Sequence, residues 1–437
     1  MDSEGLAREV IGRLRGAGHQ AYLAGGCVRD VLLGVKPKDF DIATDARPDR
    51  IMDLFPRSGR VGAHFGVVLV RDVFEQVEVA TFRSDHDYAD GRHPEQVRFE
   101  SDPRQDVQRR DFTINGLLMD PETGEVLDFV EGRADLARRV VRAIGEPDAR
   151  FREDHLRLLR AVRFAARLGF EIEAATFEAM RRDHALILGI AVERVREELV
   201  RILTEGGARR GFELLDGSGM LADLLPEVAA MKGVAQPPQF HPEGDVWQHT
   251  LLLLEQLREP SRALALAALL HDVGKPGTYR MAERIRFDGH VEEGVRVARS
   301  ILTRLRCSRE EIEQVEALID NHMRFKDVGR MKDSTLKRFL RMAEFAEHLE
   351  LHRLDAMSSS RRMENYELAK RKLEEYTAEH LRPEPLVTGA DLIGMGYDPG
   401  PRFSRMLAAL EDAQLEGRIG TPEEAMEMVR EMFPREE

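Results

Sequence analysis

Two neighbouring stretches near the N-terminus decide the fold of this chain: Ala24-Gly25-Gly26-Cys27-Val28-Arg29-Asp30 and Lys38-Asp39-Phe40-Asp41-Ile42-Ala43-Thr44. The first predicts a turn between a short apolar strand at 21–24 and a helix over 28–33. Gly25 and Gly26 let backbone N–H groups approach a phosphate, because neither residue carries a Cβ atom. The N-terminus of the following helix also favours an anion. This turn is therefore a candidate phosphate-binding site.

The second stretch places two carboxylates on one face of a predicted strand. Side chains alternate along an extended segment, so Asp39 and Asp41 point the same way and Phe40 points into the core. Two such carboxylates repel each other unless a divalent cation lies between them, and oxygen ligands suit Mg²⁺. Either motif alone is more often a plain turn or a solvated strand edge. Their close succession is what metal-assisted attack on a nucleoside triphosphate requires.

Composition sets the broad class of the protein. The chain has 437 residues, of which 42% are hydrophobic and 33% charged, and its net charge is −14. This length predicts about two to four globular domains. No apolar run is long enough to span a bilayer, the N-terminus lacks a signal-like pattern, and Cys27 and Cys307 have no metal-ligand spacing. We expect a cytoplasmic protein with no membrane partner; no pattern indicates the oligomeric state.

The motif around Gly25-Gly26-x-Val28-Arg29-Asp30 and Asp39-x-Asp41 resembles the head of the class II tRNA nucleotidyltransferase and bacterial poly(A) polymerase family. The resemblance implies an α+β fold that begins with a nucleotidyltransferase head, a small mixed β-sheet with helices. It implies four parts: a head (palm) at 1–140, an all-α neck with nucleotide template and RNA-binding helices at 141–210, an HD metal-binding domain at 211–360 and a helical tail at 361–437. It further implies Mg²⁺ in the head, and tRNA, ATP and CTP as partners.

A third carboxylate is predicted on the strand over 75–81. Val77 and Val79 face one way on this strand and Glu78 the other, so Glu78 has the phase to join Asp39 and Asp41. Alone, Glu78 would be read as a solvent-facing strand residue. The resemblance of Glu78-Val79-Ala80-Thr81-Phe82-Arg83 to the corresponding family strand assigns Glu78 to the catalytic group. The polar, turn-rich segment that follows, 83–97, is predicted to be a mobile loop.

The run Asp106-Val107-Gln108-Arg109-Arg110-Asp111-Phe112-Thr113-Ile114-Asn115 resembles the second motif of the family. Arg109 and Arg110 can neutralise the charge of a triphosphate. Asp111 and Asn115 are spaced to lie on one helix face, where they could hold ribose hydroxyls or the loop. A surface network of Arg and Asp side chains is the structural alternative.

A candidate base-reading pair follows in Glu153-Asp154-x-x-Arg157, predicted to lie on one helix face. Asp154 can accept a hydrogen bond from the exocyclic amine of C or A, and Arg157 can donate to the adjacent ring nitrogen; U and G present the opposite pattern. An isolated pair of this kind would be a helix salt bridge. The resemblance implies a protein template for the nucleotide and adds Arg29, Arg160 and Arg163 to the nucleotide-binding residues. The helix at 191–199 is expected to brace it through Glu193 and Arg196.

A second candidate site begins at the apolar helix over 263–270, which ends in His271-Asp272. Burying this pair is costly unless a charged partner satisfies it, and a divalent metal does so. Together with His249 and the distal Asp355, the pair resembles the HD phosphohydrolase superfamily, and His290 and His322 fit further ligand positions. Mixed nitrogen and oxygen ligands suit Mn²⁺, Ni²⁺, Fe or Mg²⁺. The resemblance implies hydrolysis of phosphoesters at RNA ends or of cyclic nucleotides, or a structural role.

Several alternatives stay open at this point. The favoured function is addition of the terminal C, C and A of tRNA. An enzyme that adds only the terminal A, or a poly(A) polymerase, remains possible, although Gly62-Ala63-His64-Phe65-Gly66 stands where poly(A) polymerases carry a basic run. The alternative from another class is an HD phosphohydrolase whose head binds nucleotide or RNA. Basic helices at 332–341 and 361–376 are candidate tracks for an RNA backbone, and the acidic last helix is expected to pack on protein.

Overall fold

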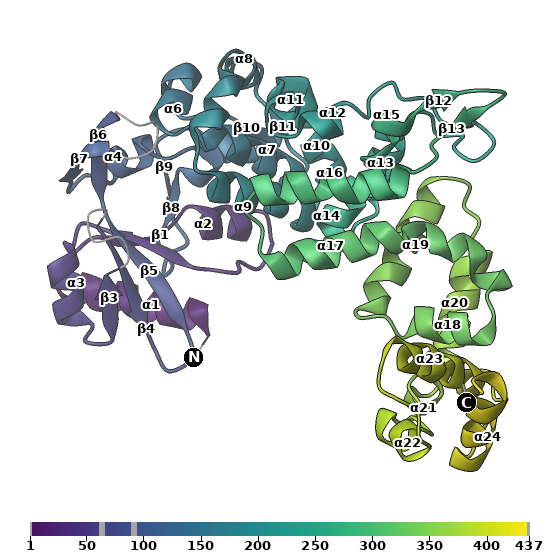
Figure 1. Cartoon of the computed structure of the whole chain (residues 1–437). Helices are drawn as coiled ribbons and strands as arrows, with labels where there is room; N and C mark the ends of the chain where they lie inside the picture. The colour runs from purple at the N-terminus through teal and green to yellow at the C-terminus, as the bar shows by residue number, and fades with distance from the viewer. Residues whose placement is uncertain (1, 61–65, 89–93, 435–437) are drawn as a thin grey trace. The chain divides into compact units, whose positions relative to one another are not determined.

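The computed structural model describes residues 2–60, 66–88 and 94–434. The chain forms two compact units, one of Met1–Ala230 with Leu257–Pro260 and Ile301–Cys307, the other of Met231–Gln256, Ser261–Ser300 and Ser308–Glu437. The first unit combines a mixed sheet with helices, and the second is almost wholly helical (Figure 1). The predicted α+β fold is confirmed. The finer domain boundaries at 140, 210 and 360 stay predictions.

Within the described residues the first unit holds a seven-stranded sheet with the strand order β3-β4-β5-β2-β1-β8-β9. Its strands are β1 (Ala21–Ala24), β2 (Asp41–Thr44), β3 (Ser58–Arg60), β4 (Val67–Arg71), β5 (Gln76–Thr81), β8 (Leu117–Met119) and β9 (Val126–Asp128). Strand β2 pairs antiparallel with β1 and parallel with β5. The parallel register sets Asp41 opposite Glu78.

Helices of the head pack around this sheet (Figure 1). They are α1 (Ser3–Gly16), α2 (Gly26–Leu32), α3 (Pro48–Leu54), α4 (Pro103–Gln108), the 3₁₀ turn η1 (Thr113–Asn115) and α5 (Gly132–Arg138). Helix α1 buries Leu6, Val10, Ile11 and Leu14, which recur at the helical period.

The prediction of a loop over 83–97 is wrong. Strands β6 (Arg83–Tyr88) and β7 (Pro94–Phe99) pair antiparallel there. The hairpin grows out of β5: the backbone of Phe82 donates to Thr44 and accepts from Glu100. Backbone pairing of this kind needs no apolar alternation, so a polar sequence can form it. The connecting residues 89–93, part of the predicted loop, lie outside the described residues.

Helices of the neck follow, with a parallel strand pair β10 (Val140–Val141) and β11 (Glu171–Ile172). They are α6 (Pro147–Glu153), α7 (Arg157–Leu168), α8 (Ala174–Asp183), η2 (His184–Gly189), α9 (Val192–Thr204), α10 (Ala208–Ser218), α11 (Met220–Leu224) and α12 (Pro226–Ala229). Helix α7 buries Leu158, Leu159, Val162 and Ala166, and it packs against α9 and α10. Its polar face is thereby turned to the head.

The second unit is built from helices joined by short turns and one small hairpin, β12 (Arg280–Met281) with β13 (Ile285–Arg286). Its helices are α13 (Val246–Glu255), α14 (Arg262–Leu270), α15 (Lys275–Thr278), α16 (His290–Arg304, whose end belongs to the first unit), α17 (Arg309–Asn321), η3 (His322–Arg330), α18 (Asp333–Leu340), α19 (Phe345–Ser358), α20 (Glu364–Glu375), α21 (Ala378–Leu381), α22 (Gly389–Gly394), α23 (Pro401–Leu415) and α24 (Pro422–Met432). None of the helices in the described residues has the length and apolar character needed to cross a bilayer.

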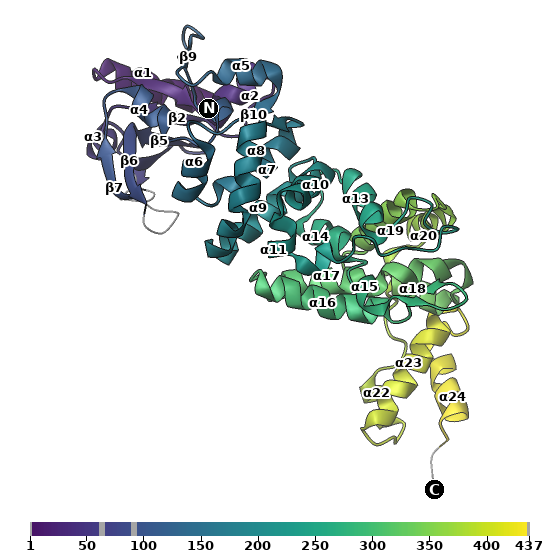
Figure 2. The same cartoon turned by 90° about the horizontal axis from the view of Figure 1, so that it is seen from above.

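The tail helices α22, α23 and α24 lie beside one another (Figure 2), and their apolar cluster buries Ala425 and Val429 of α24. The expectation that the acidic last helix packs on protein is confirmed. The basic helix over 332–341 also faces protein: Arg338 and Arg341 form ion pairs with Glu411 of α23 at 2.5 and 2.6 Å. These two guanidinium groups are thus paired with tail carboxylates, and the RNA track over 332–341 and 361–376 stays a prediction.

We predict that Gly207 at the start of α10 tolerates no side chain. Its φ is +74°, and an added Cβ would overlap the carbonyl oxygen of Ala166 in α7. Gly206 is the matched control, with φ of +99° and nothing within 4 Å of an added Cβ. We expect Gly207→Ala to lower the free energy of opening of α7 by about 1–3 kcal/mol more than Gly206→Ala, as hydrogen exchange measures it. Equal losses in the two variants would contradict the predicted overlap.

Candidate active site and candidate metal centre

The residues predicted to bind nucleotide and metal in the head surround one cavity of about 540 Å³, a size suited to a small ligand. Its lining includes Gly25, Gly26, Arg29, Asp39, Asp41, Arg109, Arg110, Asp111, Asn115, Asp154, Arg157, Arg160 and Arg163. Glu78 is not part of this lining in the described residues. It stands opposite Asp41 on the neighbouring strand.

The acidic group gathers at the start of β2. Asp41 opens this strand, Asp39 precedes it, and Ile42 and Phe40 are buried on the other side. Burial raises the pKa of Asp41 to about 6; the charge of Glu78 adds to this rise, Arg110 opposes it, and Asp39 adds a smaller part. Adjacent oxygen donors that resist ionisation together are a fitting set for a hard divalent cation.

A buried carboxylate fixes the two arginines of the second motif. Asp106 has no exposed surface, and its Oδ1 accepts from Arg109 at 2.9 and 2.6 Å, while its Oδ2 accepts from Arg110 at 3.2 and 2.9 Å. These bonds lower the pKa of Asp106 although burial opposes ionisation. Asp106 is thus a site residue that the motif alone did not predict. Its spacing of one helical turn from both arginines is the signal that could have found it.

The glycine motif predicts that another group lies close to Gly25. In the structure that group is the side chain of Arg110. The φ of Gly25 is +73°, and an added Cβ would lie 2.9 Å from Nη1 of Arg110. Its own N–H donates to the carbonyl oxygen of Leu117, which ties the turn to β8. Glycine at this position thus lets Arg110 lie over the turn at the N-terminus of α2.

A chain of polar contacts joins the head to α7. Arg29 donates to Asn115 at 2.7 Å, Asn115 donates to Asp111 at 3.1 Å, and Asp111 accepts two bonds from Arg160 at 2.9 and 2.7 Å. These bonds, above all to Arg160, outweigh burial and hold the pKa of Asp111 near 2. The helix predicted over 111–115 is wrong, since only the 3₁₀ turn η1 forms there. The two side chains meet nonetheless, through a direct hydrogen bond.

The predicted base-reading pair does not share a helix face. Asp154 has extended backbone between α6 and α7, and its Oδ1 accepts from the N–H of Leu156 at 3.1 Å. Arg157 opens α7 and donates to Glu153 at 2.8 Å and to the carbonyl oxygen of Arg109 at 2.8 Å. The predicted geometry is wrong because the chain turns at Asp154, which lies between the two helices and belongs to neither.

The brace of α7 is also different from the predicted one. Glu193 forms an ion pair with Arg306, and Arg196 donates to Glu197. It is the buried pair of Arg163 with Glu198, 2.7 Å apart, that joins α7 to α9. The guanidinium groups of Arg29, Arg160 and Arg163 also lie over the ring of Phe164, at 5.3, 5.2 and 4.4 Å from its centroid.

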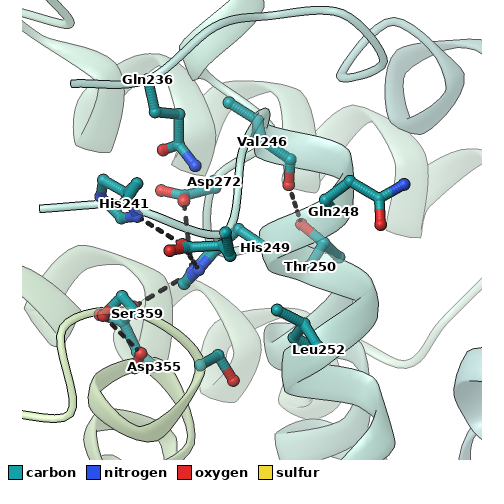
Figure 3. A network of polar contacts seen from close by, with 12 residues as sticks. Gln236, His241, Val246, Gln248, His249, Thr250, Leu252, Asp272, Asp355 and Ser359 are labelled. Atoms are coloured by element: carbon teal, nitrogen blue, oxygen red, sulfur yellow. Dashed lines mark hydrogen bonds and ion pairs between the residues drawn. The ribbon is translucent and has the colours of Figure 1, made fainter. Parts of the chain in front are cut away.

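The second candidate site brings together side chains from five segments of the second unit, and Figure 3 shows His249, Asp272 and Asp355 among them. Nε2 of His249 lies 3.1 Å from Oδ1 of Asp355, 3.3 Å from Nε2 of His271 and 3.9 Å from Oδ2 of Asp272. Ligand atoms of His249, His271 and Asp355 lie within 4.8 Å of one another, and so do those of Asp272, His290 and His322. The structure therefore places all six predicted residues at one centre.

Backbone carbonyls set the protonation of three of these imidazoles. Nδ1 of His271, His290 and His322 lies 3.0, 2.8 and 2.5 Å from the carbonyl oxygens of Ala268, Phe287 and Ile319. A carbonyl only accepts, so each ring donates from Nδ1 and leaves the Nε2 lone pair free in its neutral form. Nε2 of His290 and of His322 is buried and has no hydrogen-bond partner in the described part of the chain. Such lone pairs fit a cation held by imidazole.

The protonation states of the side chains at this centre follow from the same contacts. Burial lowers the pKa of His322 to about 4, so its ring is neutral and able to ligate. Burial opposes protonation of His249, but its bonds to Asp355 and Glu243 raise its pKa to about 9. Lys275 lies 2.6 Å from Asp272 and, with His271, keeps the pKa of that carboxyl low in spite of burial.

Comparisons with known proteins agree with both sites. Profiles of the poly A polymerase head domain, the probable RNA and SrmB-binding site of polymerase A, and the HD domain match residues 21–142, 169–232 and 245–344. The crystal structure of the Bacillus stearothermophilus CCA-adding enzyme in complex with CTP is similar, with a TM-score of 0.76, 27% identity and 99% of each chain covered.

Two curated relatives differ in how far they match. The CCA-adding enzyme of Streptococcus thermophilus is 32% identical over 426 residues, which are 96% of this chain and 94% of that protein. The CCA-adding enzyme of Levilactobacillus brevis is 45% identical over 49% of this chain and 54% of its own length. The chain thus spans about half the length of the first curated relatives it matches.

The fold and the site define the class: a nucleotidyltransferase with a poly A polymerase head, joined to an HD domain. The relationship to the Streptococcus thermophilus protein extends over nearly the whole of both chains. Within its class, this chain belongs to the family of the CCA-adding enzymes.

We predict that Asp41→Asn stabilises the protein in EDTA. The pKa of Asp41 is raised from 3.8 to about 6, so its ionised form costs folding free energy above pH 6 and none once pH falls below 4. Because the carboxylate opens to solvent in the cavity, we expect a gain below about 1 kcal/mol. Urea denaturation at several pH values measures it. A gain that persists unchanged at pH 4 would contradict this cause.

Proposed function

We propose that the head builds the terminal C-C-A of tRNA from CTP and ATP. The observation that carries this proposal is the parallel pairing of β2 with β5, which sets Asp41 opposite Glu78 beside the arginine-lined cavity. Membership of the CCA-adding family supports it, as does the CTP bound by the similar Bacillus stearothermophilus enzyme. The predicted run at 62–66 that argues against a poly(A) polymerase lies, except for Gly66, outside the described residues.

In this proposal Asp39, Asp41 and Glu78 hold Mg²⁺, which when bound stabilises negative charge that develops on the phosphate oxygens. The 3′-hydroxyl oxygen of the RNA loses its proton and forms a bond to the α-phosphorus of the nucleotide. The bond from that phosphorus to the β-phosphate breaks, and pyrophosphate leaves. Arg109 and Arg110, fixed by Asp106, orient and neutralise the triphosphate.

Base choice is assigned to the two residues that line the cavity next to α7. Asp154 accepts from the exocyclic amine that C and A share. Arg157 donates to the neighbouring ring nitrogen once one of its N–H groups leaves Glu153 or the carbonyl of Arg109. The bonds through Asp111 and Asn115 join Arg160 of α7 to Arg29 of α2 in the head.

An extension assay tests the proposed reaction. We expect a tRNA transcript lacking its last three nucleotides to gain C-C with CTP alone and C-C-A with CTP and ATP together. The variant with both Asp39→Ala and Asp41→Ala should extend it at least about 1,000-fold more slowly, because the cation is lost. Undiminished extension by this variant would refute the proposal. Extension with ATP alone, of a transcript ending in C-C or into a long A tract, would redirect it to an A-adding enzyme or a poly(A) polymerase.

We predict that Asp154→Ala relaxes base choice. Loss of a bidentate contact costs about 1–3 kcal/mol of discrimination, so incorporation of U and G relative to C and A should rise about 10- to 100-fold. Competition between CTP and UTP in the extension assay measures this ratio. Asp148→Ala is the matched control, because Asp148 on α6 pairs with Arg182 and does not line the cavity. If Asp154→Ala still selects C and A as the control does, the template assignment fails.

A second function is proposed for the HD centre, hydrolysis of phosphoesters at RNA ends or in cyclic nucleotides. It is favoured by the six convergent side chains, of which Asp272, His290, His322 and Asp355 line a cavity of about 690 Å³. Asp355, His249 and His271 would hold one divalent cation, and Asp272, His290 and His322 would complete the set. Such a cation, Mn²⁺, Ni²⁺, Fe or Mg²⁺, supplies an activated water at neutral pH.

We predict two independent reactions. His271→Ala should abolish hydrolysis of a cyclic nucleotide to the nucleoside monophosphate, because a cation ligand is lost, and should leave nucleotide addition intact. Malachite-green detection of phosphate after phosphatase coupling, alongside the extension assay, measures both. Hydrolysis that survives the loss of bound metal in His271→Ala would refute this role of the centre.

A further inference from the structure

Two residues beside the HD centre have no part in the functions proposed above. His241 and Glu243 lie in the loop before α13, and His241 lines the same cavity as Asp272 and Asp355. Oε1 of Glu243 is 2.8 Å from Nδ1 of His241 and 2.8 Å from Nδ1 of His249 (Figure 3). One carboxylate oxygen therefore contacts two imidazoles, one of them a predicted metal ligand.

The loop is built to bring Glu243 back over α13. Gly244 has φ of +124°, which lets the chain reverse. Asp245 then caps α13, accepting from the N–H of Gln248 at 2.8 Å and from the N–H of Gly233 at 2.7 Å. The N–H of Val246 donates to the carbonyl oxygen of Val234. These hydrogen bonds tie the two ends of the loop together and thus fix Glu243 against the first turn of α13.

The hydrogen-bond chemistry of this contact has one solution. An ionised carboxylate only accepts, so His241 and His249 both donate Nδ1–H to Glu243. Nε2 of His249 is then left facing His271 and Asp355, at 3.3 and 3.1 Å. The side chain of Glu243 is 7% exposed, and its second oxygen is buried without a partner in the described part of the chain. Within the described residues, the carboxylate of Glu243 forms hydrogen bonds with these two imidazoles and with no other group.

We propose that Glu243 is a positioning residue of the HD centre. It fixes the tautomer and the orientation of His249, so that Nε2 faces the cation, and it holds His241 at the cavity wall. The inference rests on the metal centre proposed above. A carboxylate behind a ligating histidine contributes about 10- to 100-fold to metal affinity.

Direct ligation is the competing role for Glu243. The ligand atoms of His241, Glu243 and His249 lie close enough to surround a second cation. Such a cation would take Nδ1 of His249 while Nε2 serves the first, which requires the ring to lose both protons. Hydrogen bonding needs no such loss. The positioning role is therefore the one that the geometry supports.

Titration of the full-length chain with Mn²⁺ by calorimetry tests the proposal. We expect Glu243→Gln to weaken binding about 10-fold and Glu243→Ala more, with the same number of ions bound as in the wild type. Glu313→Gln is the matched control, since Glu313 is an exposed residue of α17 paired with Arg309. Affinity in Glu243→Ala within about twofold of the control would overturn the proposal. So would the loss of one bound ion, which would make Glu243 a ligand.

A second measurement needs no metal. In protein labelled with ¹⁵N at histidine and kept in EDTA, the Nδ1–H proton of His249 should show the downfield shift of a hydrogen bond to a carboxylate in the wild type and should lose that shift in Glu243→Ala. An unchanged Nδ1–H signal in that variant would overturn the proposal. If the wild type binds no Mn²⁺ that His271→Ala abolishes, the metal centre itself fails, and this signal alone decides the role of Glu243. Circular dichroism of each variant confirms the fold.

Discussion

The parallel pairing of β2 with β5 is the constraint on which the head depends. Ile42 and Val79 are fully buried on these strands, and the alternation that buries them turns Asp41 and Glu78 to the opposite face. Apolar packing thus supplies the free energy that holds two carboxylates side by side. Burial, and then the charge of Glu78, raise the pKa of Asp41, so the ionised pair of carboxylates is a cost to the metal-free protein. A cation removes that cost, so the pairing of β2 with β5 favours the binding of a metal ion.

The spacing of apolar residues in the sequence predicts those parts of the fold that are determined by the packing of side chains. The alternation around Glu78 and the apolar stripe of α7 are visible in the sequence because each buried position excludes water from a large surface. The individual strands and helices and the phase of Glu78 follow from this periodicity, whereas their assembly into one mixed sheet was implied by the resemblance. The further assignment of Asp39 and Asp41 to one cavity with the arginines depended on the resemblance, because their approach is set by contacts between distant segments.

Features decided by single polar contacts could not be predicted in the same way. The hairpin of β6 and β7 forms through backbone bonds that leave no apolar signal. Asp154 and Asn115 lie outside the helices predicted for them, because a cap and a 3₁₀ turn end regular structure where hydrogen bonds to side chains compete with it. Asp106 and Glu243 were missed for a related reason: each acts through the residue it holds, and a sequence does not show which side chain a carboxylate holds.

The arginines around the head cavity have a consequence for how a nucleotide enters it. Arg109 and Arg110 share Asp106, Arg160 is bound to Asp111, and Arg163 to Glu198. A cavity neutralised in advance exerts little long-range pull on a polyanion, so encounter gains little from electrostatic steering. Admission of the nucleotide is instead an exchange of partners, in which phosphate oxygens compete with resident carboxylates at short range. Selectivity thus depends on shape and hydrogen-bond direction, and it persists in concentrated salt, where attraction between bare charges fades.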